Sequence, residues 1–301
     1  MSVSGWPRKT RDIQNHHIDS TIWNSLKYRP DDVVIASYAK SGTTWLQQIV
    51  SQLIFQGREG LDVVSLSPWI EMRAVREQSL ASAEAQSHRR FLKTHLPVDA
   101  IVFSPQAKYL YVARDGRDVV WSMYNHHLNA SPLLYQVVNE TPGRIGSPLM
   151  PPNCSVVEYF QAWLDRDGYP WLPFWQHVHS WWNIRSLPNV LMIHFSDLKT
   201  DLPRQIRRIA TFLEIPIDPV RLDAIVEHCS FPYMKAHAEQ FAIAGGAFWN
   251  GGAQTFVHKG TNGRWREALN AQQSARYEIT AIEHLGAVCA QWLERGGYVP
   301  E

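Results

Sequence analysis

The feature that most constrains the fold is an apolar strand pattern that leads directly into a helix pattern. Residues 32–38 form a short apolar run that predicts a buried strand, and residues 43–55 place large apolar side chains at helical spacing. A strand joined to a helix by so short a loop is the first half of a strand–helix–strand unit. Strands connected in this way run parallel, and the connecting helix packs on a face of the sheet.

The same order of elements returns later in the chain. Residues 91–95 and 108–113 predict two further apolar strands, and a helical run at 118–127 follows the second of them. Another apolar strand is expected at 189–195, before a helix at 201–213 with proline in its first turn. Strands that alternate with helices predict an α/β protein of three layers, with a central, mainly parallel sheet flanked by helices.

The composition fits a single domain over residues 1–301. Of the 301 residues, 45% are hydrophobic and 19% are charged, which allows a sizeable core. The 29 basic and 28 acidic side chains leave a net charge of +1, so we expect neither nucleic acid nor an anionic membrane as a partner. Any site for an anion therefore has to be local.

The cysteines and the N-terminal segment favour a cytoplasmic protein. Cys154, Cys229 and Cys289 are scattered and odd in number, which argues against a disulfide framework or a zinc site. Residues 1–12 are polar and lack the apolar stretch of a secretory signal. No segment approaches the ~18 continuous apolar residues that a membrane-spanning helix needs.

The loop between the first strand and the first helix has the chemistry of a phosphate site. It lies in the sequence YAKSGTTW at residues 38–45. Backbone N–H groups at a helix start attract anions, Gly42 permits close approach, and Lys40 and the hydroxyl groups add donors. The spacing differs from the common nucleoside triphosphate loop, because the lysine precedes the glycine. The alternative is an ordinary helix N-terminus capped by Ser41 or Thr43.

A second candidate element is the sequence KTHLP at residues 93–97. Lys93 and His95 are two positions apart on a strand and share one face, so both can point into one cleft. Histidine ionises near neutral pH, which suits removal of a proton from a hydroxyl group. The alternative is a structural histidine at the end of a strand.

Two further segments carry cationic and hydroxyl groups. Arg114 is expected at the carboxyl end of its strand, where open α/β sheets bind ligands, and Ser122 about two turns into the next helix. An arginine fork with a hydroxyl suits a terminal phosphate, and the alternative is an ion pair between Arg114 and Asp115. Residues 257–265 add cationic groups in a glycine-bearing loop, for which a solvated turn is the alternative.

These four segments, in this order, resemble the motifs of the cytosolic sulfotransferase family, including its bacterial-type members. The matching segments are residues 38–45, 93–97, 114–122 and 258–265, and the resemblance spans roughly residues 25–270. It implies a P-loop-like fold and an enzyme that transfers a sulfuryl group from 3'-phosphoadenosine 5'-phosphosulfate (PAPS). The implied acceptor is a hydroxyl group of a small molecule, attacked in line with a histidine as general base.

The resemblance also implies roles for individual residues. His95 is the expected base, with Lys93 stabilising charge on the transferred group and Lys40 on the bridging oxygen. A sulfuryl group carries less negative charge than a phosphoryl group, so lysines suffice and no metal is expected. The residues expected to bind the donor are Lys40, Ser41, Gly42, Thr43 and Thr44 at the 5'-phosphosulfate, Arg114, Ser122, Lys259 and Gly260 at the 3'-phosphate, Trp45 and Phe231 around the adenine, and Phe195, Ser230 and His258 at other family contact positions.

Several positions depart from the family pattern. Ala39 replaces a loop proline, and His258 replaces an arginine, so a constant positive charge becomes titratable and nucleotide affinity is expected to fall as pH rises. Phe195 replaces a tyrosine and Cys229 a threonine, so two hydrogen bonds to the adenosine end are not expected. The family's dimer motif would fall on residues 266–275 and is not matched, so we do not predict the usual dimer.

Two other functions stay open at this stage. A Mg²⁺-dependent P-loop kinase would use Asp115 or Asp197 as a metal ligand, but the loop spacing does not fit and His95 would have no role. A non-catalytic nucleotide-binding relative would bind the nucleotide without transferring a group. The presence of both Lys40 and His95 argues against that alternative.

The remaining candidates concern histidine pairs and long loops. The adjacent pairs at 16–17 and 126–127 are predicted to be structural or to face solvent, because neighbours on a helix point about 100° apart. The stretches 129–153 and 245–263 are predicted to be loops that act as lids or binding loops. The acceptor is expected to be held by loops such as 65–90, 129–153 and 235–258, and nearby aromatic residues favour an apolar or aromatic alcohol.

Overall fold

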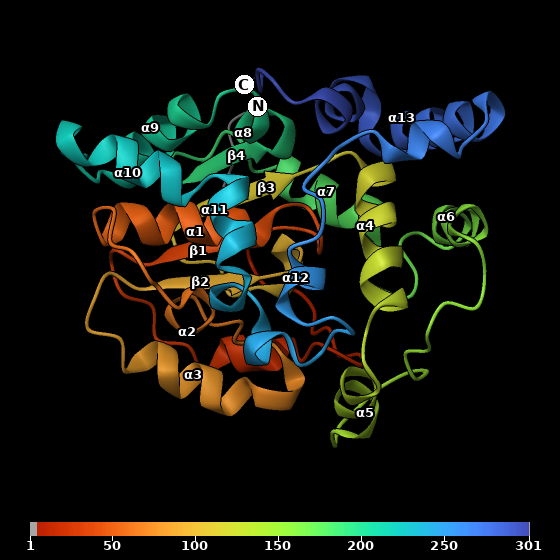
Figure 1. Cartoon of the computed structure of the whole chain (residues 1–301), viewed down its shortest axis with the longest axis horizontal. Helices are drawn as coiled ribbons and strands as arrows, with labels where there is room; N and C mark the ends of the chain where they lie inside the picture. The colour runs from red at the N-terminus through yellow and green to blue at the C-terminus, as the bar shows by residue number, and fades with distance from the viewer. Residues whose placement is uncertain (1–4, 301) are drawn as a thin grey trace.

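The computed structural model describes residues 5–300, which fold around a four-stranded parallel sheet. The strands are β1 (Val33–Ala36), β2 (Phe91–Thr94), β3 (Lys108–Ala113) and β4 (Val190–His194). Their order is β2-β1-β3-β4, and every neighbouring pair is parallel (Figure 1). The predicted α/β class with a central parallel sheet is therefore confirmed.

Both faces of the sheet are covered, which gives the three layers. Val33 and Ile35 of β1 pack in one apolar cluster with α1 (Thr43–Ile54) and α9 (Leu202–Leu213), while Val34 and Ala36 pack in the opposite cluster. Alternate residues of a strand point to opposite faces, so a strand buried on both sides is apolar throughout. The helices that contribute to the opposite cluster include α4 (Gly116–Leu128), α6 (Val156–Asp165), α7 (Phe174–Trp182) and α13 (Ala271–Arg295).

Shorter elements surround this frame. None of the helices between residues 5 and 300 is both long and apolar enough to cross a bilayer. The remaining α-helices are α2 (Val63–Leu66), α3 (Arg76–Glu84), α5 (Pro132–Glu140), α8 (Phe195–Thr200), α10 (Pro219–His228), α11 (Phe231–Ala236) and α12 (Ala253–Phe256). The 3₁₀ turns are η1 (Ser20–Asn24), η2 (Arg73–Val75), η3 (Val98–Ala100), η4 (Ala238–Gln240), η5 (Ile243–Gly246) and η6 (Arg264–Glu267).

The predicted strands and main helices are present, with ends that differ by one or two residues. Phe195 is an exception, because it begins α8 instead of ending β4. The prediction of a loop over residues 129–153 is wrong for α5, which starts with proline in its first turn and buries Leu134 and Val138. The second predicted loop, 245–263, contains only the end of η5 and the short α12.

A buried arginine ties the C-terminal helix to the sheet. Arg117 is fully buried, and its guanidinium donates to the Asp115 carboxylate at 2.8 Å and to Glu278 of α13 at 3.0 Å. The same guanidinium lies 3.8 Å from the ring centre of Trp265 and 4.7 Å from that of Tyr277. Asp115 caps the start of α4, so this cluster fixes the helix that follows β3.

We predict that Arg117→Met lowers the free energy of unfolding by about 3 kcal/mol, because it leaves a buried carboxylate without its cation. Arg276→Met is the matched control, since Arg276 and its partner Asp165 are 56% and 49% exposed and should contribute less than about 1 kcal/mol. Urea unfolding followed by tryptophan fluorescence measures both changes. Equal losses in the two variants would contradict a structural role for Arg117.

Candidate active site

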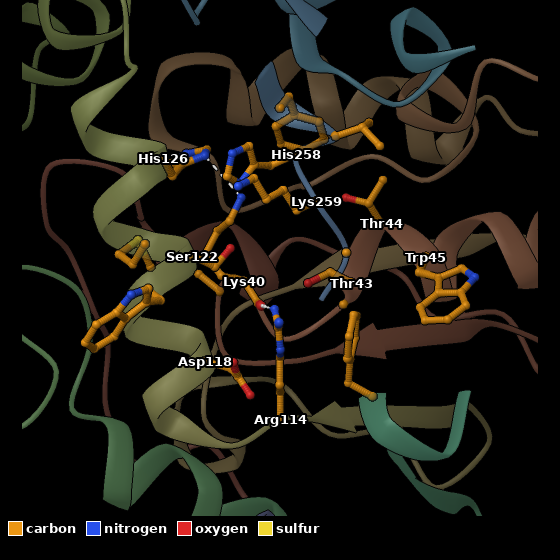
Figure 2. Close-up of a pocket in the computed structure, with 18 of the residues that line it drawn as sticks. Lys40, Thr43, Thr44, Trp45, Arg114, Asp118, Ser122, His126, His258 and Lys259 are labelled. Carbon is orange, nitrogen blue, oxygen red and sulfur yellow. Dashed lines mark hydrogen bonds between the residues drawn. The ribbon is translucent and has the colours of Figure 1, made fainter. Parts of the chain in front are cut away.

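A cavity of about 620 Å³ opens at the carboxyl ends of the sheet strands. Lys40 follows β1, His95 follows β2 and Arg114 follows β3, and all three line the cavity. Parallel strands end at the same edge of the sheet, which is where open α/β folds place their ligands. Figure 2 shows side chains from the β1–α1 loop, α4 and the 258–265 loop turned toward the same space.

The loop after β1 leaves the start of α1 open. Gly42 has φ 109° and stands at the cap position without a side-chain hydrogen bond, and Thr43 Oγ1 instead lies 2.5 Å from Ser37 Oγ. Within residues 5–300, no acceptor binds the backbone N–H groups of Thr43 and Thr44. The alternative of a side-chain cap considered above is therefore wrong, and uncapped N–H groups at a helix N-terminus attract anions.

Gly42 is required by its surroundings. A Cβ atom at this position would stand 2.8 Å from the Phe195 ring, and its positive φ also disfavours other residues. Lys40, with φ 69°, takes the second unusual conformation of the loop. The conformation of this loop therefore requires glycine at position 42.

Lys40 points into the cavity and meets His126 of α4. Its Nζ lies 3.1 Å from His126 Nδ1 and 5.0 Å from the ring centre of Phe256 (Figure 2). Burial, and then the charges of Lys93 and Arg114, lower the pKa of Lys40 to about 7. The amine is thus poised to take up a proton when an anion enters.

Arg114 is held between two loops. Its guanidinium donates to Asn262 Oδ1 at 3.0 Å and to the Thr261 carbonyl at 2.8 Å, and it lies 4.2 Å from the Phe195 ring centre. Asp115 pairs with Arg117, so the ion pair with Arg114 considered above does not form. One edge of the guanidinium is therefore used to organise the site, and the side chain still lines the cavity.

The loop after α12 adds further positive charge. Arg264 Nη1 lies 3.4 Å from His258 Nδ1, and both side chains line the cavity together with Lys259. Burial, and then the charge of Arg264, lowers the pKa of His258. Asp118 of α4 fixes this loop by accepting the Gly263 N–H at 2.7 Å. Sequence reasoning did not select Arg264, although a cation inside the glycine-bearing loop was a usable signal.

At the other end of the cavity, hydrogen bonding fixes the tautomer of His95. Nδ1 lies 2.9 Å from the Ser37 carbonyl oxygen, which can only accept, so Nδ1 carries the proton and Nε2 the lone pair. In the described part of the chain Nε2 has no hydrogen-bond partner. Burial lowers the pKa of His95 well below its usual value, and Lys93 adds to the effect. A neutral imidazole with a free lone pair can accept a proton.

Glu71 organises this end and was missed by sequence reasoning. Its carboxylate accepts from the N–H of His95 at 2.8 Å, Trp69 Nε1 at 2.6 Å and Thr94 Oγ1 at 2.9 Å. Burial raises the pKa of Glu71, and these hydrogen bonds oppose the rise. Lys93 lies 4.7 Å from the Trp69 ring centre, and burial lowers its pKa to about 8 although Glu71 raises it. No local motif marks Glu71, because Thr94 and His95 are distant from it in the sequence and only Trp69 is close.

The histidine pairs also differ from expectation. His17, His126 and His127 line the cavity, and His17 and His127 are buried, so the solvent-facing alternative is wrong for these two. The structural alternative fits His127, whose Nδ1 lies 3.1 Å from the Tyr159 hydroxyl oxygen. Helix α5 contributes Leu134, and the segment before α12 contributes Trp249, to the same wall. The loops around the cavity thus form an apolar, aromatic chamber beside His95.

The structure brings nearly all sequence-predicted site residues to this one cavity. Ser41 is the exception, since its side chain is buried outside the lining. The predicted residues that line the cavity are Lys40, Gly42, Thr43, Thr44, Trp45, Lys93, His95, Arg114, Ser122, Phe195, Ser230, Phe231, His258, Lys259 and Gly260.

Comparisons with known proteins agree with this arrangement. A model of the sulfotransferase domain matches residues 30–288, so the chain belongs to the sulfotransferase family and is a sulfotransferase enzyme. It is 28% identical to a glycolipid sulfotransferase of Mycobacterium tuberculosis, over 94% of each chain, and 28% identical to rat Sulfotransferase 1A1, over 83% of this chain and 82% of the relative.

Solved structures share the fold. A mouse sulfotransferase complexed with PAP superposes with a TM-score of 0.70 at 20% identity, covering 91% of each chain. Retinol dehydratase in complex with androsterone and the inactive cofactor PAP superposes with a TM-score of 0.68 at 22% identity, covering 89% of this chain and 86% of that one.

We predict that Lys40→Met stabilises the free protein at neutral pH by at least about 1 kcal/mol. The folded pKa near 7 lies below the unfolded value, so protonating Lys40 opposes folding. The gain should be largest at and below pH 7 and shrink toward zero as pH approaches 10.5. Urea unfolding at several pH values measures it.

Lys108→Met is the matched control, because Lys108 lies away from the cavity and pairs with the exposed Glu214. It should not raise stability at any pH. If Lys40→Met has no stabilising effect at pH 7, the folded protein does not lower the pKa of the Lys40 amine.

Proposed function

We propose that the protein transfers a sulfuryl group from PAPS to a hydroxyl group of a small-molecule acceptor, as one sulfotransferase domain. The observation that carries the proposal is the open start of α1 in the same cavity as the unpaired His95 Nε2. An anion site beside a base suits the transfer of a charged group to a hydroxyl. The PAP bound to the two solved relatives supports the choice of donor.

The donor carries negative charge at two places, and the cavity has hydrogen-bond donor groups at the start of α1 and cationic groups in the 258–265 loop. The N–H groups of Thr43 and Thr44, with Lys40, would hold the 5'-phosphosulfate. Arg114 and Lys259, with the remaining groups of the 258–265 loop, would hold the 3'-phosphate. Arg264 adds a permanent positive charge beside His258. The loop thus still has a guanidinium, although His258 stands in place of the family's arginine.

The adenine would lie between aromatic side chains. Trp45 is fixed by its Nε1–H, which donates to the Cys229 carbonyl at 2.7 Å, and its ring centre is 5.4 Å from that of Phe195. Phe231 lies against Gly260, where a Cβ atom would stand 2.6 Å from the ring. Ser230 caps α11 and so fixes Phe231 at the edge of the cavity.

In the proposed reaction His95 Nε2 removes the proton of the acceptor hydroxyl as its oxygen attacks sulfur. The bond between sulfur and the bridging phosphate oxygen breaks, and the electron pair stays on the phosphate of the departing PAP. Lys93 would stabilise the transferred group and Lys40 the bridging oxygen. The amine of Lys40 regains its proton beside this anion, which makes it a cation where charge develops.

We predict that His95→Asn lowers kcat for sulfation of 2-naphthol by about 10²–10⁴-fold while PAP affinity stays within a few-fold of wild type. His95 lies at the acceptor end, so nucleotide contacts remain. Calorimetry with PAP, run beside ATP and Mg²⁺, measures binding, and transfer from PAPS measures kcat. Lys40→Ala should weaken PAP binding and serves as the contrasting variant.

Full activity in His95→Asn would contradict the assignment of the base. Preference for ATP with Mg²⁺ over PAP would overturn the proposed donor and favour the kinase. Tight PAP binding without transfer to any hydroxyl compound would favour the non-catalytic alternative.

We also predict that His258→Arg tightens PAP binding at pH 7.5 about tenfold, since a charged hydrogen bond to phosphate replaces a neutral imidazole. The pKa of His258 is lowered, so wild-type affinity should rise as pH falls and the residue gains its proton. The variant should lose that part of the pH dependence. His179→Arg, on the exposed side of α7, adds the same charge away from the cavity and should change neither property.

A further inference from the structure

His17 lies on the segment before η1 and belongs to the apolar, aromatic chamber beside His95. Its side chain is only 8% exposed and lines the cavity. Its ring centre is 4.9 Å from that of Trp171 and 6.4 Å from that of Trp69. The same two indoles contact His95, at 6.0 Å and 5.0 Å. The two histidines therefore flank one aromatic slot.

Hydrogen bonding fixes the tautomer of His17 through its neighbour. His16 Nε2 lies 2.8 Å from the carbonyl oxygen of Pro170, which only accepts, so His16 carries its proton on Nε2. The Nδ1 atom of a neutral His16 is then an acceptor. It faces His17 Nδ1 at 2.5 Å, so His17 must carry its proton on Nδ1 and leave the lone pair on Nε2.

That lone pair is unused by the described residues, and the side chain that carries it lines the cavity. His17 Nε2 has no hydrogen-bond partner between residues 5 and 300, yet it is not sealed in protein as His177 Nε2 is. Burial lowers the pKa values of both His16 and His17, which keeps both rings neutral at physiological pH. A buried acceptor without a partner is unfavourable unless a ligand supplies the donor.

The rest of the chamber is suited to a flat apolar body. Trp69 and Trp171 form its aromatic sides, and Met72, Val137 and Val138 line the same cavity. Such a surface offers no specific partner to a polar group in the middle of the acceptor. His126 and His127 of α4 also line the cavity, but His126 Nδ1 meets Lys40 Nζ and His127 Nδ1 lies 3.1 Å from the Tyr159 hydroxyl oxygen. Beside the two indoles, the described imidazoles with a free Nε2 are those of His95 and His17.

We propose that His17 is a specificity-determining residue whose Nε2 accepts a hydrogen bond from the acceptor. The favoured acceptor is an aromatic alcohol that carries a second O–H or N–H donor away from the sulfated hydroxyl. This inference rests on the proposed sulfotransferase reaction and names the substrate class for its acceptor site.

A matched series of acceptors tests the proposal with the full-length protein and PAPS. The series is 2-naphthol, the 2,6- and 2,7-dihydroxynaphthalenes, and the monomethyl ether of each diol. At least one diol should exceed 2-naphthol in kcat/KM about tenfold, beyond the statistical advantage of having two hydroxyls. Its methyl ether should gain nothing over 2-naphthol, because an ether oxygen cannot donate to Nε2.

Two variants separate hydrogen bonding from shape. In His17→Phe the ratio of diol to 2-naphthol should collapse to the statistical value. In His16→Phe the tautomer of His17 is no longer fixed, so the methyl ether should improve relative to 2-naphthol. Calorimetry with PAP shows whether each variant keeps a folded nucleotide site.

The outcomes are distinguishable. Equal wild-type kcat/KM for the diols, the ethers and 2-naphthol would overturn the role of His17, and so would a diol preference that survives in His17→Phe. Binding of PAP without transfer to any member of the series would overturn the acceptor class. Failure to bind PAP at all would instead contradict the proposed donor. The wild-type series decides the question even if a variant does not fold.

Discussion

The unsatisfied N–H groups at the start of α1 are the constraint on which the site depends. A helix start in a cavity leaves polar groups that some partner must satisfy, and no described side chain caps this one. Lys40 and Arg114 add positive charge to the same cavity, which they reach from the ends of neighbouring strands. All of them favour a ligand that is anionic and rich in oxygen acceptors.

Burying charged amines opposes folding, and burial is the main cause that lowers the pKa of Lys40 to about 7 and that of Lys93 to about 8. An amine that gives up its proton in the free protein avoids part of this desolvation cost, and an anion in the cavity would favour its protonation. Arg117 has the opposite solution a few residues from Arg114, since its charge is fully matched by Asp115 and its neighbours. Arg117, whose charge is neutralised by carboxylates, therefore has a structural role. Lys40 and Lys93, whose charges are less well neutralised, line the cavity.

The sequence was sufficient for the parts of the structure that depend on local patterns. The strands and the helices after them follow from apolar periodicity, and β3 has the predicted ends. The β1–α1 loop, which is proposed to bind phosphate, could be located because its residues are contiguous. Glu71 could not be found, since its role depends on donors far from it in the sequence, including Trp23 and Thr94. Helix α5 was missed because turn-forming residues after it concealed a short apolar face.

The histidines show that residue type alone does not fix the role of a side chain, because tertiary contacts set its tautomer and its surroundings. His95 and His17 are both buried, both are neutral, and both carry the proton on Nδ1 with Nε2 free. They differ in what surrounds the lone pair. His95 follows Lys93 and its Nδ1 contacts Ser37 at the end of β1, so in the proposed reaction a hydroxyl held there would meet the donor. His17 lies beyond the two indoles, where an accepted hydrogen bond can only position the acceptor. Two identical side chains in one chamber are thereby suited to different tasks, one to receive a proton and the other to select the molecule that supplies it.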